Sequence, residues 1–138
     1  MKVFLDANVL VTVLNKEYPL FPHAARLVSF AGTARLRVYT SPICLAIAFY
    51  FAEKKSGSAL AKTKLALLAE RLAITDVGQA VVWQAATDPR VLDFEDGLEY
   101  YAARSAGCTC LVTEDASDFY FADLEIIGTK EFLQKYLV

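Results

Sequence analysis

The sequence contains only one histidine, His23, and its three cysteines show no CxxC spacing. A histidine-rich zinc site and a histidine-based catalytic triad are therefore excluded, because each needs residues that this chain lacks. The odd cysteine count of Cys44, Cys108 and Cys110 is not typical of a disulfide framework. It favours reduced core thiols and a cytoplasmic protein.

Long apolar runs and a large net charge are also missing. The longest apolar run, residues 43–52, is shorter than the ~20 residues that a membrane-spanning helix needs, so no membrane segment is predicted. Asp6 interrupts the apolar stretch near the N-terminus, so no signal peptide is expected. A formal net charge of −2 argues against a strongly basic nucleic-acid-binding protein.

What the chain does have is an unusually high hydrophobic content, 56% of 138 residues, with a mean hydropathy of +0.35. A chain of this length fits one domain, residues 1–138, and can bury roughly 70% of the surface that its unfolded form exposes. The excess of apolar residues indicates a sheet covered on both faces and an oligomer interface as well. We expect a homodimer, with the helices around residues 49–68 as its interface.

Short apolar strands alternate with helical segments along the chain. Strands are predicted at residues 2–5, 36–40, 72–75, 110–113 and 125–127. Helices are predicted at residues 7–14, 23–32, 42–55, 58–72, 78–87, 94–106 and 129–136, with a helical turn at 116–119. This alternation predicts an α/β fold, a three-layer α/β/α sandwich with a central parallel sheet.

Carboxylates follow two of these strands directly. Asp6 comes after the strand at residues 2–5, Asp115 comes shortly after the strand at 110–113, and Asp118 lies three residues further on. The carboxyl ends of parallel strands share one edge of the sheet, where this architecture binds ligands. Acids gathered there repel one another unless protons or a cation neutralise them, and Mg²⁺ and Mn²⁺ prefer oxygen ligands. The pattern predicts a divalent-metal site.

Charge is segregated along the chain. Residues 93–125 contain nine acids and a single base, Arg104, whereas lysines gather between residues 54 and 64. An acidic pocket beside a basic flank suits a metal-assisted enzyme that acts on a polyanion. Lys54 and Lys55 are candidate nucleic-acid contacts, although cations at a helix end are commonly just solvated.

Helix capping is the alternative explanation for each acid taken alone. Aspartate is a favoured N-cap residue, so Asp6, Asp93 and Asp115 could each begin a helix or turn. Capping does not explain Asp96, which lies inside its predicted helix, or Asp118, which lies a turn beyond the cap. Residues three apart share a helical face, so Asp96 pairs with Glu99 and Asp115 with Asp118.

Three segments resemble the acidic motifs of PIN-domain nucleases, the family of the VapC-type toxin ribonucleases. The opening VFLDANVL, residues 3–10, resembles the first motif, and DFEDGL, residues 93–98, is similar to the Asp-Phe-Glu-Asp-Ala-Leu segment. The segment VTEDASDF, residues 112–119, is similar to the motif Val-Thr-Arg-Asn-x-x-Asp-Phe. The segments occur in the order of the family's motifs and span nearly the whole chain.

This resemblance implies an endoribonuclease that depends on Mg²⁺ or Mn²⁺, namely the toxin of a VapBC-type toxin–antitoxin pair. It implies that RNA is the substrate and that an antitoxin protein is a partner. The implied metal ligands are Asp6, Asp96 and Asp118, and Asp115 is a further catalytic carboxylate. The implied supporting residues are Asn8, Thr113 and Glu99.

Two departures from the motifs leave other functions open. The family commonly has the pattern Ser-Pro-x-x-x-Ala-Glu after the second strand, but Ile47 stands at the glutamate position here, and Glu114 replaces the usual arginine. One alternative is therefore a weak or non-catalytic PIN-like module that binds RNA or a protein partner. A second alternative is an aspartyl-phosphate receiver or phosphatase, which needs a lysine near the acids and for which Lys130 is the candidate.

Overall fold

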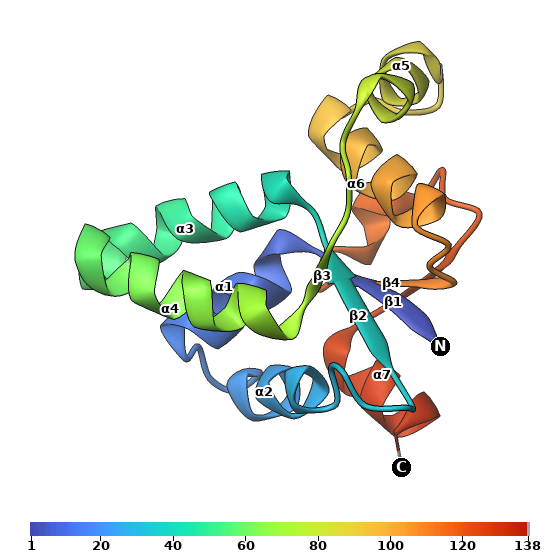
Figure 1. Cartoon of the computed structure of the whole chain (residues 1–138). Coiled ribbons are helices and arrows are strands. Elements are labelled where there is room, and N and C mark those ends of the chain that lie inside the picture. Colours follow the sequence, from blue (N-terminus) through green and yellow to red (C-terminus); the bar gives the residue numbers. More distant parts are fainter. Residues whose placement is uncertain (138) are drawn as a thin grey trace.

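Five short strands form one parallel sheet at the centre of the molecule (Figure 1). The computed structural model describes residues 1–137; Val138, the last residue of the predicted domain, lies outside the described residues. The strands are β1 (Lys2–Leu5), β2 (Arg37–Thr40), β3 (Ala73–Ile74), β4 (Cys110–Val112) and β5 (Glu125–Ile127). Their order in the sheet is β3-β2-β1-β4-β5, and every pairing is parallel, as predicted.

Helices cover both faces of this sheet. They are α1 (Ala7–Asn15), α2 (Phe21–Ser29), α3 (Pro42–Ser56), α4 (Ser58–Arg71), α5 (Gln79–Thr87), α6 (Phe94–Ser105) and α7 (Thr129–Tyr136), with a 3₁₀ turn, η1 (Ala116–Phe119). Figure 1 shows α5 and α6 on one side of the sheet and α2 and α7 on the other, while α3 and α4 project as a hairpin beside α1. The predicted three-layer α/β/α architecture is confirmed.

Local signals explain where the helices begin and end. The Ser41 hydroxyl accepts a hydrogen bond from the Cys44 backbone N–H at 3.2 Å and thereby caps α3, as predicted. Helix α2 ends at Ser29 rather than at Gly32, so that boundary was predicted wrongly. The Phe30 N–H still bonds to helix carbonyls, but Ala31 has already left the helix to form a parallel bridge with Leu36. Tertiary pairing thus ends this helix before the glycine does.

The carboxyl ends of β1 and β4 hold the polar residues that follow them in fixed positions. Leu5 pairs with Val112, the Asp6 N–H bonds to the Val112 carbonyl at 3.0 Å, and the Thr113 N–H bonds to the Ile127 carbonyl at 3.0 Å. Leu5 and Val112 are fully buried. Asp6 and Thr113 therefore stand next to each other on a rigid edge of the sheet.

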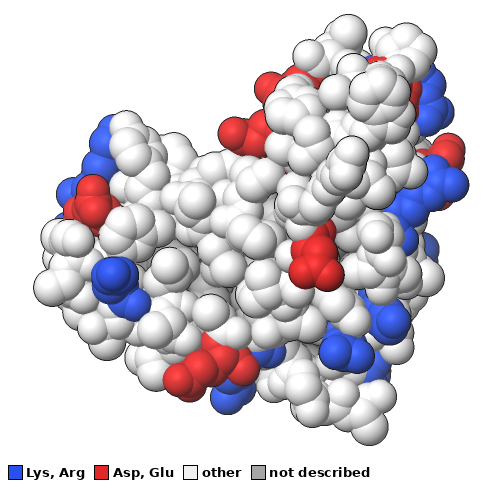
Figure 2. Space-filling view, turned by 45° about the horizontal axis from the view of Figure 1, so that its top comes forward, with Lys and Arg blue, Asp and Glu red and all other residues white. Residues whose placement is uncertain are grey.

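The cysteines and the surface agree with the composition. All three cysteines are free and buried, as predicted for core thiols. Among the described residues, no helix is long and apolar enough to cross a membrane. The face shown in Figure 2 is largely uncharged, with lysines and arginines mostly towards its margins. Large apolar side chains are exposed on α3, α4 and α5: Tyr50, Phe51, Leu60, Leu67, Val82 and Trp83.

Candidate metal centre

A cavity of about 590 Å³ opens at this edge of the sheet. Among the described residues its lining contains no lysine, arginine or histidine, but it contains nine acids: Asp6, Glu17, Asp93, Glu95, Asp96, Glu99, Glu114, Asp115 and Asp118. The structure thus brings together all five acids that the sequence singled out. Asn8 also lines the cavity. Glu17, which reaches the cavity from the segment between α1 and α2, was not expected from any sequence motif.

Thr113 organises one wall of the cavity. Its hydroxyl donates to Asp6 Oδ2 at 2.7 Å and accepts hydrogen bonds from Asn8 Nδ2 at 3.1 Å and from the Asp115 N–H at 3.0 Å. Asn8 Nδ2 also lies 3.2 Å from Asp115 Oδ2. A hydroxyl has one donor and two acceptor positions, so all three are used. Thr113 and Asn8 therefore fix Asp6 and Asp115 relative to each other.

Asp6 is both a cap and a member of the cavity wall. Its Oδ1 accepts a hydrogen bond from the Ala7 N–H at 2.6 Å at the start of α1, so the capping interpretation holds for that oxygen. Oδ2 is held by Thr113 instead, and the side chain lines the cavity. One oxygen can thus serve the helix while the carboxylate remains available to a ligand.

A buried group of three side chains closes the inner end of the cavity. Glu99 on α6 is 2% exposed, and its Oε1 accepts a hydrogen bond from Cys44 Sγ on α3 at 3.0 Å. Burial, followed by the hydrogen bond to Asp6, raises the pKa of Glu99 to about 11, so Glu99 is a neutral acid that donates to Asp6. Among the described residues, Asp6, Cys44 and Glu99 form the one group of three with all ligand atoms within 4.8 Å of one another.

Cys44 was placed by sequence reasoning in the apolar core, and its contact with the site was missed. Burial raises the pKa of the Cys44 thiol, so it is held as the neutral thiol. The available signal was its position three residues before Ile47, which puts both residues on one face of the helix.

Asp96 has a raised pKa because it is partly buried and lies among other acids. Burial, followed by the charges of Asp93 and Asp118, raises its pKa to about 7. Asp93 caps α6 by accepting a hydrogen bond from the Asp96 N–H at 3.2 Å, as the sequence suggested. Asp96 and Asp118 do not belong to the group of three residues whose ligand atoms lie within 4.8 Å of one another. An ion shared with Asp6 would therefore reach some of its ligands through water, as Mg²⁺ commonly does.

Asp115 and Asp118 reach the cavity from η1. Asp115 stands at the N-cap position of this turn, but its side chain makes no capping hydrogen bond, so capping does not account for it. The backbone N–H of Asp118 bonds to the Asp115 carbonyl at 3.0 Å, and this bond turns both side chains towards the cavity.

The arrangement can now be compared with known proteins. The family model described as PIN domain matches residues 2–117, a span that includes Asp6, Asp96 and Asp115. The chain belongs to the PIN domain family.

Relatives of this PIN domain match it along 79% to 98% of its length. Ribonuclease VapC1 of Aquifex aeolicus (strain VF5) is 27% identical over 140 residues, covering 98% of this chain and 95% of that protein. The structure of VapBC-1 from nontypeable Haemophilus influenzae aligns with a TM-score of 0.71 and 20% identity, over 94% of this chain and 99% of that one. VapC20 of Mycobacterium tuberculosis, a toxin that cleaves the sarcin–ricin loop, aligns with a TM-score of 0.61 and 20% identity, over 79% and 86%. These structural likenesses support the fold.

Ile47 and Glu114 are the positions at which this PIN domain departs from the motifs. Ile47 lines the cavity, so the position faces the site but presents an apolar group. Glu114 Oε1 accepts a hydrogen bond from the Thr129 N–H at 2.8 Å, at the start of α7. This acid therefore stabilises a helix N-terminus besides lining the cavity.

The two lysines proposed for nucleic-acid contact do not line the cavity. Lys55 Nζ donates to the Asn15 carbonyl, and Lys64 Nζ lies 3.5 Å from the Leu14 carbonyl, so both lysines join the α3–α4 hairpin to the C-terminus of α1. Lys54 Nζ lies 4.4 Å from the centre of the Tyr50 ring. Each proposed lysine thus has a contact within the fold, and a role for Lys54 or Lys55 in RNA binding stays a prediction.

Proposed function

We propose that this PIN domain is a divalent-metal-dependent endoribonuclease and the toxin of a toxin–antitoxin pair. The observation that carries the proposal is the cavity at the carboxyl edge of the sheet, which gathers nine acids without a basic residue among those described. Such a set is costly to keep charged without a cation, as the raised pKa of Asp96 indicates. Membership of the PIN domain family supports the same function.

In this proposal Asp6, Asp96 and Asp118 hold the ion, directly or through water. Asp115 is a further ligand or orients the attacking water, and Asn8 and Thr113 keep Asp6 and Asp115 in place. Glu99, whose ligand atom lies within 4.8 Å of that of Asp6, closes the buried end of the site. A bound divalent ion would supply a water of lowered pKa and offset the charge of the phosphoryl oxygens.

Mg²⁺ or Mn²⁺ is the proposed cofactor, because the exposed donors in the cavity are oxygens and Cys44 is held as a neutral thiol. We propose RNA as the substrate, supported by the relatives described as a ribonuclease and as a toxin that cleaves the sarcin–ricin loop. An antitoxin protein is the proposed partner, supported by the fold shared with VapBC-1. Free buried thiols fit a cytoplasmic location.

Ile47 favours the second candidate function, a non-catalytic PIN-like module. It lines the cavity at the position where the family commonly has a glutamate, so the cavity lacks that carboxylate. The aspartyl-phosphate alternative has less support. Lys130, its candidate lysine, lines a separate cavity with His23 and Arg26, away from the acids.

Asparagine substitutions test the proposal. Asp96→Asn and Asp118→Asn should each abolish RNA cleavage and weaken Mn²⁺ binding in calorimetry by at least tenfold, because each removes one anionic ligand. Asp123→Asn is the matched control, since Asp123 is an exposed acid outside the cavity whose pairing with Arg104 is at the surface. Retained cleavage in both site variants would overturn the ligand assignment. Mn²⁺ binding without cleavage by the unaltered protein would favour the non-catalytic module.

A further inference from the structure

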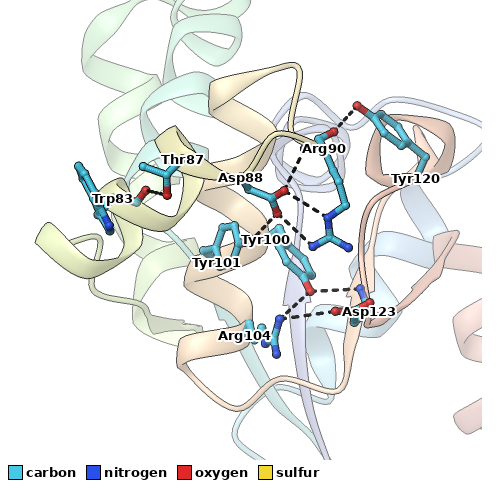
Figure 3. Close-up of polar contacts among 9 residues, drawn as sticks. All are labelled: Trp83, Thr87, Asp88, Arg90, Tyr100, Tyr101, Arg104, Tyr120 and Asp123. Carbon is cyan, nitrogen blue, oxygen red and sulfur yellow. Dashed lines mark hydrogen bonds and ion pairs between the residues drawn. The ribbon is translucent and has the colours of Figure 1, made fainter.

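A half-buried carboxylate, Asp88, lies outside the acidic cavity, in the loop that joins α5 to α6 (Figure 3). Asp88 Oδ1 accepts hydrogen bonds from the Arg90 N–H at 2.9 Å and from Arg90 Nε at 3.2 Å. Asp88 Oδ2 accepts from Arg90 Nη2 at 3.1 Å and from the Tyr101 hydroxyl at 2.6 Å. The Asp88 side chain is 7% exposed. The hydrogen bonds from Arg90, followed by the one from Tyr101, fix the conformation of the loop and hold the pKa of Asp88 well below its usual range.

Tyr120 joins this loop to a second segment of the chain. Its hydroxyl donates to the Arg90 carbonyl at 2.6 Å, as Figure 3 shows. Tyr120 directly follows η1, which carries Asp118, and the loop leads into Asp93 and the first turn of α6, which carries Asp96. We call Asp88, Arg90, Tyr101 and Tyr120 the loop clasp. The clasp thus links the two segments that bring Asp96 and Asp118 to the cavity.

The loop is seated directly on α6 beside Asp96. A Cβ atom at Gly97 would lie 2.6 Å from Val91 Cγ1 and 3.1 Å from Ala85 Cβ, so glycine is what permits this close approach. Interiors packed at this distance transmit displacements because they have no space to absorb them. A shift of the loop is therefore passed to the first turn of α6.

Other ties between these two segments lie further along α6. The Tyr100 hydroxyl accepts a hydrogen bond from the Asp123 N–H at 3.1 Å, and Arg104 pairs with Asp123 at 3.6 Å. Arg104 and Asp123 are both more than half exposed, so the ion pair contributes little. The hydrogen bond from Tyr120 to Arg90, by contrast, joins the two segments near the N-terminus of α6, where Asp96 lies.

We propose that the loop clasp positions Asp96 and Asp118 for metal binding by setting the distance between the segments that carry them. The proposal rests on the proposed function, because it presumes that these acids hold the ion. Asp96 and Asp118 repel each other in the absence of a cation, so the two segments need a tie that does not depend on the metal. Tyr101 and Tyr120 are positioning residues and do not contact the substrate.

Tyr120→Phe is the sharpest test, because it removes one hydroxyl from a ring that is 60% exposed and leaves the packing intact. We expect the Mn²⁺ dissociation constant to rise roughly three- to tenfold, the range that the loss of one hydrogen bond gives. The Mn²⁺ concentration needed for half-maximal RNA cleavage should rise by the same factor, while the rate at saturating Mn²⁺ is kept. A purely structural tie would change the melting temperature and leave both Mn²⁺ values unchanged.

Tyr136→Phe is the matched control. It also removes a tyrosine hydroxyl that donates a hydrogen bond to a carboxylate, that of Glu125. Tyr136 ends α7 and Glu125 begins β5, and neither residue lines the cavity. The melting temperature of this variant sets the change expected from losing one such bond, and its Mn²⁺ affinity should equal that of the unaltered protein. Asp88→Asn, which keeps the shape of the side chain, should weaken Mn²⁺ binding at least as much as Tyr120→Phe does.

The outcomes separate the two proposals. If the unaltered protein binds no Mn²⁺, the metal centre and the clasp proposal both fail. If it binds Mn²⁺ and Tyr120→Phe binds equally well, the clasp proposal alone is overturned, whatever Asp88→Asn does to folding. A tenfold loss in Tyr136→Phe would also overturn it, since the effect would then not be specific to the loop.

Discussion

At the residue scale, the site depends on side chains that serve two purposes at once. Asp6 caps α1 through one oxygen and meets Thr113 through the other, and Asp93 caps α6 while lining the cavity. An aspartate N-cap and a ligand at the carboxyl edge of a sheet need the same location, because helices begin where parallel strands end. Capping and metal binding are therefore compatible at these positions.

Ile47→Glu tests the missing carboxylate. Because Ile47 lines the cavity, a glutamate there should add an anionic oxygen ligand and tighten Mn²⁺ binding by about tenfold, with faster RNA cleavage. Ile47→Gln is the matched control, because a glutamine side chain has nearly the same shape as a glutamate but carries no charge. Calorimetry and a cleavage assay at fixed Mn²⁺ measure both variants. Equal affinities for the two variants would mean that the side chain at position 47 does not reach the ion.

The pKa of Asp96 predicts how stability depends on pH. Because burial and neighbouring acids raise this pKa to about 7, the folded protein holds a proton that the unfolded chain, with an ordinary aspartate pKa, has released. The free energy of unfolding without metal should therefore fall as pH rises from about 4 to about 7. Asp96→Asn should remove the part of this dependence that comes from Asp96, leave the part that comes from the raised pKa of Glu99, and raise the melting temperature at neutral pH. Asp6→Asn should lower the melting temperature instead, since an amide has one acceptor oxygen and cannot accept from both the Ala7 N–H and the Thr113 hydroxyl.

The same proton is released when a metal binds. Apparent Mn²⁺ affinity should rise between about pH 6 and about pH 8, and calorimetry in buffers of different ionisation enthalpy should show proton release near neutral pH. Affinity that is independent of pH over this range would contradict the assignment of Asp96 as a ligand.

At the element scale, each part of the site is delivered by the end of a strand or the face of a helix. Strands β1 and β4 place Asp6 and Thr113 side by side, α6 presents Asp96 and Glu99 on one face, and η1 turns Asp118 inward. Helix α3 closes the cavity with Ile47 and, one turn earlier, the buried Cys44. The site therefore lies where the carboxyl ends of β1 and β4 meet the N-terminal halves of α3 and α6.

Glu114, which follows β4, accepts a hydrogen bond from the first residue of α7, and its removal should affect that helix. Glu114→Ala removes the acceptor of the Thr129 N–H and should lower the free energy of unfolding by about 1 kcal/mol, the usual effect of losing a helix cap. Mn²⁺ affinity should change by less than twofold, because this carboxylate is engaged at the helix. Denaturant unfolding and calorimetry measure the two effects. A large loss of Mn²⁺ affinity at unchanged stability would show that Glu114 is a metal ligand.

At the scale of the whole molecule, several large apolar side chains are exposed on the surface. Figure 2 shows a broad uncharged face, and α4 exposes Leu60 and Leu67 at 50% and 61%. Apolar patches on soluble proteins commonly mark contacts with other chains. The homodimer expected from composition stays a prediction, and substitutions on the α3–α4 hairpin can test it.

Leu67→Asp should convert the expected homodimer into a monomer, because a charge buried in an apolar interface is strongly unfavourable. Leu92→Asp is the matched control, since Leu92 is 84% exposed in the loop before α6, outside the hairpin. Light scattering at micromolar concentration measures the mass of both variants and of the unaltered chain. A monomeric unaltered protein would refute the prediction, and a dimeric Leu67→Asp would place the interface elsewhere.

The sequence by itself determined the order of the elements, the parallel sheet and most acids of the cavity, although not Glu17. These features depend on local physics: β1 reads as a short apolar strand, Ser41 and Pro42 mark a helix start, and an aspartate follows the strand. In a parallel sheet, the position of an acid after a strand is enough to place it at the ligand-binding edge. Asp6 and Asp115 could therefore be placed without coordinates, whereas Asp96, which follows no strand, was assigned by the resemblance of residues 93–98 to a PIN-domain motif.

Only the tertiary structure decided which groups neutralise, orient or lock these acids. The contact of Cys44 with Glu99, the cap that Glu114 provides to α7 and the tie from Tyr120 to Arg90 join segments that are 55, 15 and 30 residues apart. The raised pKa of Glu99 likewise arises from burial, which depends on how α3 and α6 pack around it. No local pattern encodes such pairs, because their distances are set by the packing of whole helices on the sheet.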